Sequence, residues 1–300
     1  MKKLLVLLLA LVCVFAFAAC KETPPAASQS TASEAPVPEY PEEPEVPAEP
    51  EAPAASEDIA PTADDDLAYI LYKGAVVIGV TDYEPMDYLD ADGKWIGFDA
   101  EFAEAVSAKL GVTPKFQEIN WDTKEIELAA GNIDVIWNGL TVTEERRENM
   151  DFSDSYLRNR QVVVVKAADA ANYPDVAAFA GKTVTAEAGS AGETSALSDF
   201  ADATYIASSA QSSALLEVKA GTSDAAIIDY TMAVAMTGEG TDNADLVALE
   251  IPLTDEEYAI GFRLGSTAVA RFNEIIAELV ADGTIDELAV KYGVDDLLIK

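Results

Sequence analysis

The chain has 300 residues, a formal net charge of −35 at pH 7, two cysteines and no histidine. The lack of histidine excludes Ser-His and Cys-His nucleophile pairs and histidine-ligated metals, and the sequence predicts no metal and no cofactor. A surface this acidic repels nucleic acid, so no nucleic-acid partner is expected.

The N-terminus predicts a lipoprotein signal peptide over residues 1–20. Lys2 and Lys3 precede an apolar run over residues 4–19 that is too short to be a comfortable membrane span. Cys20 follows two small residues, which resembles the lipobox of bacterial lipoproteins, where the cysteine carries the lipid. An ordinary cleaved secretory signal is the alternative. Cleavage would take the formal charge from −35 to −37 and leave one cysteine, so no disulfide is expected.

Residues 21–61 predict a disordered tether. Proline, alanine, glutamate and serine dominate this stretch, and it has too few apolar residues to form a core. Proline and like charges keep such a chain extended. With a lipidated Cys20, the tether would hold an exported protein at the outer face of the bacterial cell membrane.

The next part of the chain, from about Leu67, alternates strand and helix patterns. A buried strand, a hairpin turn, two helices and a second buried strand are predicted at residues 75–80, 90–94, 99–110, 122–131 and 133–137. The turn has an Asp-x-Asp-Gly sequence, but it lacks the bidentate acid of a calcium loop at the required spacing. A plain turn is therefore favoured over a metal site.

The stretch from Asn138 to Arg146 follows the second buried strand and is predicted to open a short helix. Thr141 and Glu144 stand at capping-box spacing, which would fix the start of that helix. The unpaired N–H groups of a first helical turn and the planar fork of Arg146 suit a carboxylate. The alternative is that Arg146 balances Glu144 or Glu145 on a solvated surface.

The second half of the chain repeats this plan. Strands are predicted at 161–166, 181–185, up to Asp229 and at 257–263, and helices up to Leu197 and at 214–220, 267–281 and 285–292. Gly189, Ser190 and Ala191 form a second corner that would present N–H groups and a hydroxyl to an anion, or serve only as a linker.

The alternation of strands and helices predicts an α/β fold with a mainly parallel sheet in each half. Ligands of such sheets sit at the carboxyl ends of the strands. Asp229 ends a strand in the second half, as Asn138 and Gly139 end one in the first. These polar strand ends are therefore candidate ligand contacts.

Short motifs recur along the chain in one order. They are Gly97-Phe98-Asp99, Trp121, Gly131-x-x-Asp134, Thr141-x-Thr143-x-x-Arg146, Asp151-Phe152-Ser153, Gly189-Ser190, Gly221-x-x-Asp224 with Asp229, and Ala281-Asp282-Gly283-Thr284. Their order and spacing resemble extracellular solute-binding proteins family 3, the amino-acid-binding components of ABC importers. The resemblance covers about Gly74 to Val294.

The resemblance implies a two-lobed α/β fold of the type II, periplasmic-binding-protein-like (Venus-flytrap) kind, with two crossover hinge strands. Lobe 1 would comprise residues 67–162 and 258–300, and lobe 2 would comprise residues 163–257. The hinges would lie near residues 161–164 and 257–261.

The resemblance also implies roles for individual residues. Arg146 would hold the α-carboxylate of an amino acid with help from Thr141, Asp229 would take the α-ammonium group, and Tyr83 would cover the side chain. The predicted ligand-binding set further contains Trp137, Asn138, Gly139, Ser190 and Ala191. A structural role for Asp229, and core or hinge packing for Tyr83 and Trp137, are the alternatives.

The sequence leaves the side chain of the ligand open. Ala191 stands where the family usually has threonine, which removes a hydroxyl from the second corner. The acids Asp82, Glu84 and Asp87 would favour a cationic side chain, whereas Asn138 would pair with an amide.

The resemblance implies extracytoplasmic binding of a free, polar amino acid and its delivery to ABC permease subunits by hinge closure, without catalysis. We expect the chain to act as a monomer. One alternative is an enzyme resembling cyclohexadienyl dehydratase on the same fold, with Glu193 or Asp229 as general acid. Another alternative is an amino-acid sensor module.

Overall fold

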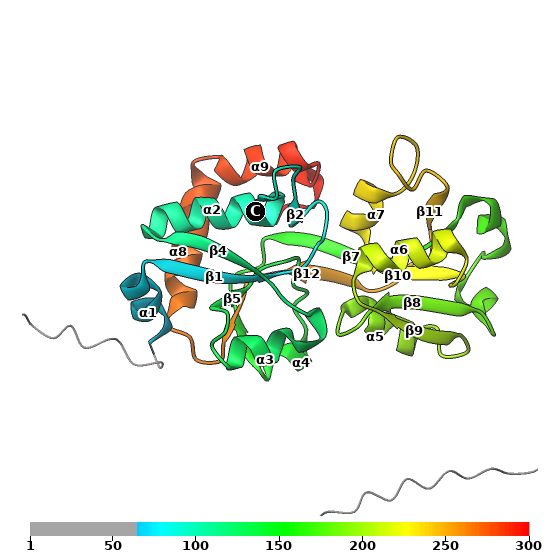
Figure 1. The fold of residues 1–300 in the computed structure, drawn as a ribbon, viewed down its shortest axis with the longest axis horizontal. Coiled ribbons are helices and arrows are strands. Elements are labelled where there is room, and N and C mark those ends of the chain that lie inside the picture. Colours follow the sequence, from blue (N-terminus) through cyan, green and yellow to red (C-terminus); the bar gives the residue numbers. More distant parts are fainter. Residues whose placement is uncertain (1–64, 300) are drawn as a thin grey trace, which may run out of the picture. The chain divides into compact units, whose positions relative to one another are not determined.

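A computed structural model describes residues 65–299 of the chain. The predicted signal peptide, Cys20 and the tether lie outside the described residues. Among residues 65–299, no helix is both long and apolar enough to cross a membrane. Two larger β-sheets organise two lobes, which lie side by side in Figure 1.

The sheet of lobe 1 has five strands in the order β4-β1-β5-β13-β6. β1 (Ala75–Val80) pairs in parallel with β4 (Thr113–Glu118) and with β5 (Val135–Ile136). β13 (Gly261–Arg263) pairs antiparallel with β5 and with β6 (Met150–Phe152). Because β1 and β5 are parallel neighbours, the loops that follow them leave the sheet at the same edge.

Helices cover both faces of this sheet. α1 (Asp66–Lys73), α2 (Phe98–Leu110), α8 (Ala268–Ala281) and α9 (Thr284–Tyr292) contribute apolar side chains to the core on one face (Figure 1). α3 (Lys124–Ala129) contributes to a smaller core on the other face. The core of lobe 1 therefore fixes the edge from which the loops after β1 and β5 emerge.

The periodicity of the sequence correctly predicts α2. Phe98, Phe102 and Val106 recur every four residues and are all buried, and Gly111 ends the helix with a φ of +75°. The predicted hairpin turn lies between the antiparallel strands β2 (Tyr88–Leu89) and β3 (Trp95–Ile96).

The sheet of lobe 2 has its central strand, β10 (Ala225–Asp229), parallel to β8 (Thr183–Glu187) and antiparallel to β7 (Leu157–Lys166). β9 (Thr204–Ser208) and β11 (Leu246–Leu249) flank this group. β8 and β10 thus end at one edge, where Glu187 and Asp229 are the last residues of their strands.

The helices of lobe 2 lie between its strands in the chain. Three are α-helices, α5 (Ala191–Ser198), α6 (Gln211–Ala220) and α7 (Tyr230–Met236), and two are 3₁₀-helices, η2 (Ala167–Asn172) and η3 (Val176–Phe179). Lobe 1 adds two more 3₁₀-helices, η1 (Trp121–Thr123) and η4 (Asp295–Leu297).

Two strands carry the chain between the lobes. β7 extends from lobe 1 into the sheet of lobe 2, and β12 (Asp255–Tyr258) returns beside it in antiparallel pairing (Figure 1). The predicted fold class, two α/β lobes with two crossover strands, is confirmed. The lobe boundaries at residues 162/163 and 257/258 stay a prediction.

Several sequence-based boundaries are wrong. The helix that contains Arg146 is α4 (Glu144–Arg147), and its N-cap is Thr143 rather than Thr141, because the Thr143 side chain accepts a hydrogen bond from the Arg146 N–H. The helix expected over 122–131 is shorter, since Trp121 to Thr123 form a 3₁₀ turn. The strand expected over 257–263 is two strands, and both sheets are mixed rather than mainly parallel.

A buried aspartate ties α2 to the strand end that precedes the site. Asp99 is fully buried, and its Oδ2 accepts hydrogen bonds from the Gly139 N–H at 2.7 Å and the Tyr156 hydroxyl at 2.8 Å. Burial raises the pKa of Asp99 from 3.8 to about 7, although these hydrogen bonds act to lower it. The folded protein therefore binds more protons than the unfolded chain between these two values.

We predict that Asp99 makes the fold less stable as the pH rises. Because the folded-state pKa lies above the unfolded value, the free energy of unfolding falls as the pH rises from 3.8 to about 7. Asp99→Asn keeps an acceptor oxygen but does not titrate, so its loss of stability from pH 5 to pH 8 should be smaller by ~1 kcal/mol or more. Urea unfolding measures this difference. The same change at exposed Asp92 is the control, and an unchanged pH slope in Asp99→Asn would contradict the assignment.

Candidate functional site

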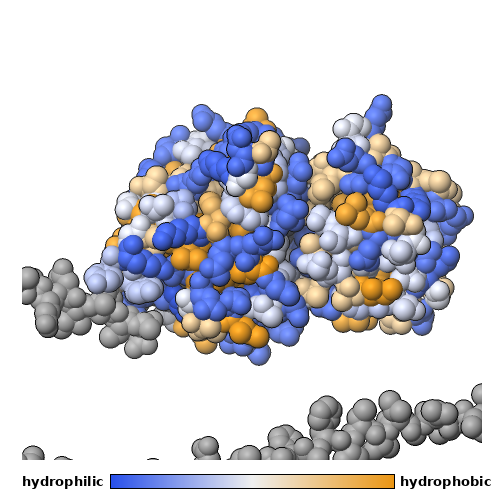
Figure 2. Space-filling model, viewed as in Figure 1, coloured by the Kyte–Doolittle hydropathy of each residue, from blue (hydrophilic) through white to orange (hydrophobic). Residues whose placement is uncertain are grey.

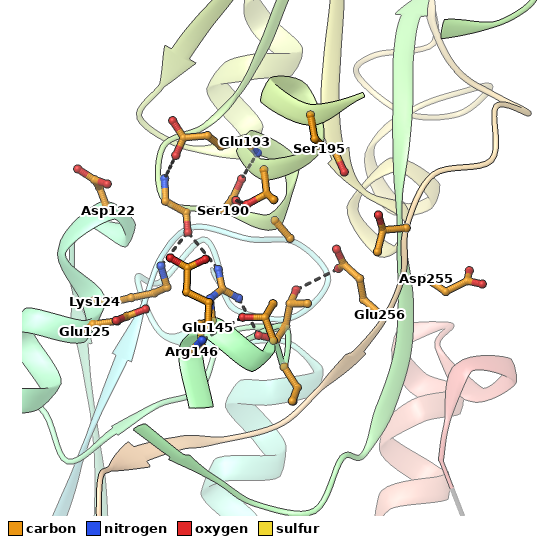
Figure 3. Close-up of a pocket in the computed structure, with 18 of the residues that line it drawn as sticks. Asp122, Lys124, Glu125, Glu145, Arg146, Ser190, Glu193, Ser195, Asp255 and Glu256 are labelled. Carbon is orange, nitrogen blue, oxygen red and sulfur yellow. Dashed lines mark hydrogen bonds between the residues drawn. The ribbon is translucent and has the colours of Figure 1, made fainter. Parts of the chain in front are cut away.

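The two lobes face each other across a groove beside the crossover strands. The groove has a volume of about 600 Å³ and is lined by α3, α4 and the loop before α4 from lobe 1, and by the start of α5 from lobe 2. Figure 2 shows a largely hydrophilic surface on the lobe 1 side of the junction between the lobes. Figure 3 shows Lys124 and Arg146 on one side of the groove, facing Ser190 and Glu193 on the other.

Arg146 projects from the first turn of α4 into the interior, with only 8% of its surface exposed. Its Nη1 donates to the Thr141 carbonyl at 2.7 Å, and its Nη2 donates to the Gly189 carbonyl of lobe 2 at 3.1 Å (Figure 3). A guanidinium has five N–H donors, so these two bonds leave donors for another acceptor. Arg146 is buried and forms no ion pair with Glu144 or Glu145 among the described contacts, so the alternative of a solvated surface pair does not hold.

The corner of lobe 2 is a variant of the capping box in which Glu193 bonds the residue before the N-cap Ser190. The Ser190 hydroxyl accepts from the Glu193 N–H at 3.1 Å, and Glu193 Oε2 accepts from the Gly189 N–H at 2.7 Å. The Gly189 carbonyl points across the groove and also accepts from Lys124 Nζ at 2.8 Å. One carbonyl of lobe 2 therefore binds two cationic side chains of lobe 1.

Lys124 is held within lobe 1 by the Trp121 carbonyl, at 3.2 Å from its Nζ, and lies 4.9 Å above the Trp121 ring. Burial, and then the charge of Arg146, lower the pKa of Lys124 to about 7. Lys124 therefore contributes less positive charge to the groove than a surface lysine does.

Asp229 ends β10 and is surrounded by amide donors. Its Oδ1 accepts from Asn159 Nδ2 at 2.5 Å and from Gln161 Nε2 at 2.8 Å, and its Oδ2 accepts from the side chain of Gln211. Burial raises its pKa, and these hydrogen bonds oppose the shift. No Lys or Arg of residues 65–299 forms an ion pair with Asp229, so the carboxylate can still take a cation.

Glu256 of β12 shares two of these donors. Its Oε2 lies 3.1 Å from both Asn159 Nδ2 and Gln161 Nε2, and it accepts from the Thr141 hydroxyl at 3.0 Å. Burial, and then the charge of Asp229, raise the pKa of Glu256 to about 7. Asp229 of β10 thus forms one network with Glu256 and two amides of the crossover strands, and Thr141 joins it from lobe 1.

Tyr83 and Gly139 close the lobe 1 side of the site. The Tyr83 hydroxyl lies 2.5 Å from the Thr231 hydroxyl of lobe 2 and 2.7 Å from the Tyr258 hydroxyl. Gly139 has a φ of +57°, and a β-carbon at this position would lie 2.6 Å from Tyr83 Cε1. Glycine is therefore required for both the backbone conformation and the approach of the ring.

Asn138 has its hydrogen-bonding capacity used inside lobe 1. Its Oδ1 accepts from the Thr81 N–H and hydroxyl, and its Nδ2 donates to the Thr81 carbonyl and to Asp87. Its predicted pairing with a ligand amide would break these bonds. Asp87 is fully buried, not at the mouth of the groove, and Asp82 is exposed.

These residues enclose a small cavity between the lobes, deep to the groove. Its volume is about 10 Å³, which is room for about one water molecule. It is lined by eight residues of the predicted ligand-binding set, Tyr83, Asn138, Gly139, Thr141, Arg146, Ser190, Ala191 and Asp229. Trp137 does not line it, because its ring packs against Phe102 in the core at 4.9 Å between centroids.

Sequence reasoning did not single out six residues as members of this site. Trp121, Glu187 and Gln211 line the cavity, and Asn159, Gln161 and Glu256 support Asp229 and Thr141. A sequence signal could have found Glu187, because this acid follows closely on the strand predicted at 181–185, as Asp229 ends its own strand. The crossover-strand residues had none, since their contacts join positions far apart in the chain.

Comparison with known proteins agrees with this geometry. The profile of bacterial extracellular solute-binding proteins, family 3, matches residues 76–295. The chain belongs to this family. The match covers all of the residues that line the cavity.

Individual relatives of this solute-binding protein bind amino acids. The arginine-binding extracellular protein ArtP of Bacillus subtilis (strain 168) is 29% identical over 227 residues, covering 73% of this chain and 86% of ArtP. A substrate-binding protein of an ABC uptake transporter from Streptococcus pneumoniae, solved with bound histidine, is 33% identical with a TM-score of 0.72, covering 80% of this chain and 100% of its own.

A third relative connects the fold to an enzyme lineage. The ancestral amino acid-binding protein AncCDT-1, described as a precursor of cyclohexadienyl dehydratase, is 27% identical with a TM-score of 0.70, covering 75% of this chain and 98% of its own. These likenesses confirm the two-lobed fold of this solute-binding protein.

We predict that Gly139→Ala destabilises the protein more than a glycine replacement that strains only the backbone. Gly74→Ala is the matched control, because Gly74 has a φ of +63° and nothing lies within 4 Å of its added β-carbon. The Tyr83 ring, which the added methyl would strike, is bonded to Tyr258 and Thr231 and cannot move freely. Gly139→Ala should lower the free energy of unfolding by ~1–3 kcal/mol more than Gly74→Ala in denaturant titrations. Equal losses would show that the ring contact is unimportant.

Proposed function

We propose that this solute-binding protein closes its lobes over a free, polar amino acid and delivers it to the permease of an ABC transporter. The observation that carries the proposal is the cavity that brings Arg146 and Asp229 together from opposite lobes. A zwitterion needs one cationic and one anionic partner, and both of these side chains keep unused hydrogen-bonding capacity.

In this proposal Arg146 binds the α-carboxylate and Asp229 binds the α-ammonium group. Thr141 was expected to help hold the carboxylate. Its hydroxyl donates its proton to Glu256 instead, so in this proposal its lone pairs accept from the ammonium group. Tyr83 covers the ligand beside Asn138 and Gly139 of lobe 1, and Ser190 and Ala191 form the wall of lobe 2. Trp137 supports the lobe 1 residues from the core.

Binding is proposed to require movement of the lobes. A cavity of about 10 Å³ cannot admit an amino acid until the lobes part or side chains move. A ligand that contacts both Arg146 and Asp229 interacts with the two lobes at once only when they are close together. It therefore shifts the population toward the closed form, with the crossover strands as hinges.

The N-terminal residues add proposals about location. Membership of an extracellular family supports export, and the lipobox-like sequence supports cleavage before Cys20 and lipid attachment to it. Residues 21–61 would then tether the binding lobes to the outer face of the cell membrane. Because one chain supplies both lobes of the site, we propose a monomer, with lobe 1 as residues 67–162 plus 258–300 and lobe 2 as residues 163–257.

The contacts in the site give less support to the alternative, an enzyme resembling cyclohexadienyl dehydratase. The Glu193 carboxylate accepts from the Gly189 N–H and the Asp229 carboxylate is held by three amides, so neither has the partners of a proton donor. Incubation with prephenate or arogenate should give no product, and turnover would establish the enzyme.

A thermal-shift screen of the standard amino acids tests the proposed function. A ligand that binds only the folded protein increases the free energy of unfolding by RT ln(1 + [L]/Kd) and therefore raises the melting temperature. We expect at least one amino acid to raise it and unrelated sugars to leave it unchanged. No shift with any amino acid, using folded protein freed of bound ligand by unfolding and refolding, would refute the proposal.

We predict that Arg146→Ala weakens the binding of every amino acid about a hundredfold or more, because each α-carboxylate loses its buried cationic partner. Arg147→Ala is the matched control, since Arg147 is exposed and its guanidinium lies over Phe152 at 5.2 Å. Isothermal titration calorimetry measures both variants. If Arg146→Ala binds as tightly as Arg147→Ala, the site is assigned wrongly.

A further inference from the structure

Glu187 is the one acid lining the cavity that has no partner. It is the last residue of β8, its side chain is only 3% exposed, and it lines the cavity with Asp229 and Arg146. Within residues 65–299, its Oε1 is buried without a hydrogen bond, and its carboxylate takes part in no ion pair. Burying a carboxylate without a partner is costly.

The neighbouring charges do not satisfy Glu187. Among the described residues, Lys124 is the cation that acts on the Glu187 carboxyl group. Its Nζ, however, donates to the carbonyls of Trp121 and Gly189. Burial, and then the charge of Asp229, raise the pKa of Glu187 to about 8. The carboxyl group is therefore poised to ionise when a cation comes within hydrogen-bonding distance.

The lining residues include one more acid than a neutral zwitterion can pair. Arg146 is the single cation among them, and Glu187 and Asp229 are two acids. An amino acid in its zwitterionic form matches Arg146 and one of the acids, which leaves the other acid without a partner. A second positive charge on the ligand would pair with that remaining acid and favour its ionised form.

Resting on the proposed function, we propose that Glu187 binds the side chain of the ligand and that the ligand is an amino acid with a cationic side chain. Asp229 is already surrounded by the amides of Asn159, Gln161 and Gln211, which fix it for the α-ammonium group common to all amino acids. Glu187 has no such fixed partners, and a guanidinium or ammonium group supplies charge-assisted donors to it.

Two other roles for Glu187 predict different behaviour. A protonated Glu187 would donate to an uncharged amide side chain, and the protein would then prefer neutral ligands. If Glu187 instead held the α-ammonium group, its removal would weaken charged and neutral ligands equally.

The test compares L-arginine with L-citrulline, which has nearly the same shape without the positive charge. Isothermal titration calorimetry on the parent protein should give an affinity for L-arginine higher by on the order of tenfold to a hundredfold. Glu187→Gln retains the shape of the side chain and should reduce this ratio to about threefold or less, chiefly by weakening L-arginine. Glu239→Gln is the matched control, since it removes an exposed acid of the same lobe and should leave the ratio unchanged.

Each outcome decides between the hypotheses. A preference of the parent for L-citrulline or L-glutamine over L-arginine, or a ratio that Glu187→Gln leaves unchanged, overturns the inference about Glu187 while the proposed function stands. Failure of the parent to bind any amino acid refutes the proposed function itself.

Binding of L-citrulline by Glu187→Gln shows that the variant is folded and that its loss of L-arginine affinity is specific. If Glu187→Gln binds neither ligand, the side chain is needed for the site as a whole and the inference is overturned.

Discussion

The arrangement of the site depends on two buried carboxylates that share the same amide donors. Asn159 and Gln161 of β7 each lie within hydrogen-bonding distance of both Asp229 and Glu256. Two acids this close repel one another, and the network is stable because the amides, and protonation of one acid, offset that repulsion. Since β7 and β12 are the strands that cross between the lobes, the same network that orients Asp229 also fixes the geometry of the crossover.

Buried carboxylates also position the loop that follows β5 in lobe 1. Asp99 accepts from the Gly139 N–H, and Asp87 accepts from Asn138, so two buried acids hold the loop after β5 from behind. That loop leads to Thr141 and to Arg146, which bonds back to the Thr141 carbonyl. The position of the guanidinium is therefore set by side chains that never reach the cavity. A chain with a large negative charge places several of its acids inside the fold, where they act as acceptors for backbone and side-chain donors.

Much of the fold and part of the site could be predicted from the sequence. Hydrophobic periodicity located α2 and a run of β-branched residues located β1, and the polar ends of apolar strands pointed to Asp229 and to the loop that carries Arg146. The local rules failed at the helix cap, where capping-box spacing with Glu144 pointed to Thr141 but the Thr143 side chain accepts from the Arg146 N–H. They also failed where the determinant is a long-range contact. Nothing near Glu256 in the sequence shows that Asn159, 97 positions away, donates to it. Glu187 was missed although its place at a strand end resembles that of Asp229.

The hydrogen bonds that the Gly189 carbonyl accepts affect the residence time of a bound ligand. It joins the lobes by accepting from both Arg146 and Lys124, and the bond between the Tyr83 and Thr231 hydroxyls joins them at a second point. These bonds must break before the lobes separate, whatever the cavity contains. They therefore add to the barrier for opening, and the residence time of a ligand reflects the separation of protein groups as well as the loss of its own contacts. A partner that competes for the Gly189 carbonyl, or pulls the lobes apart at the groove, would accelerate release without touching the ligand.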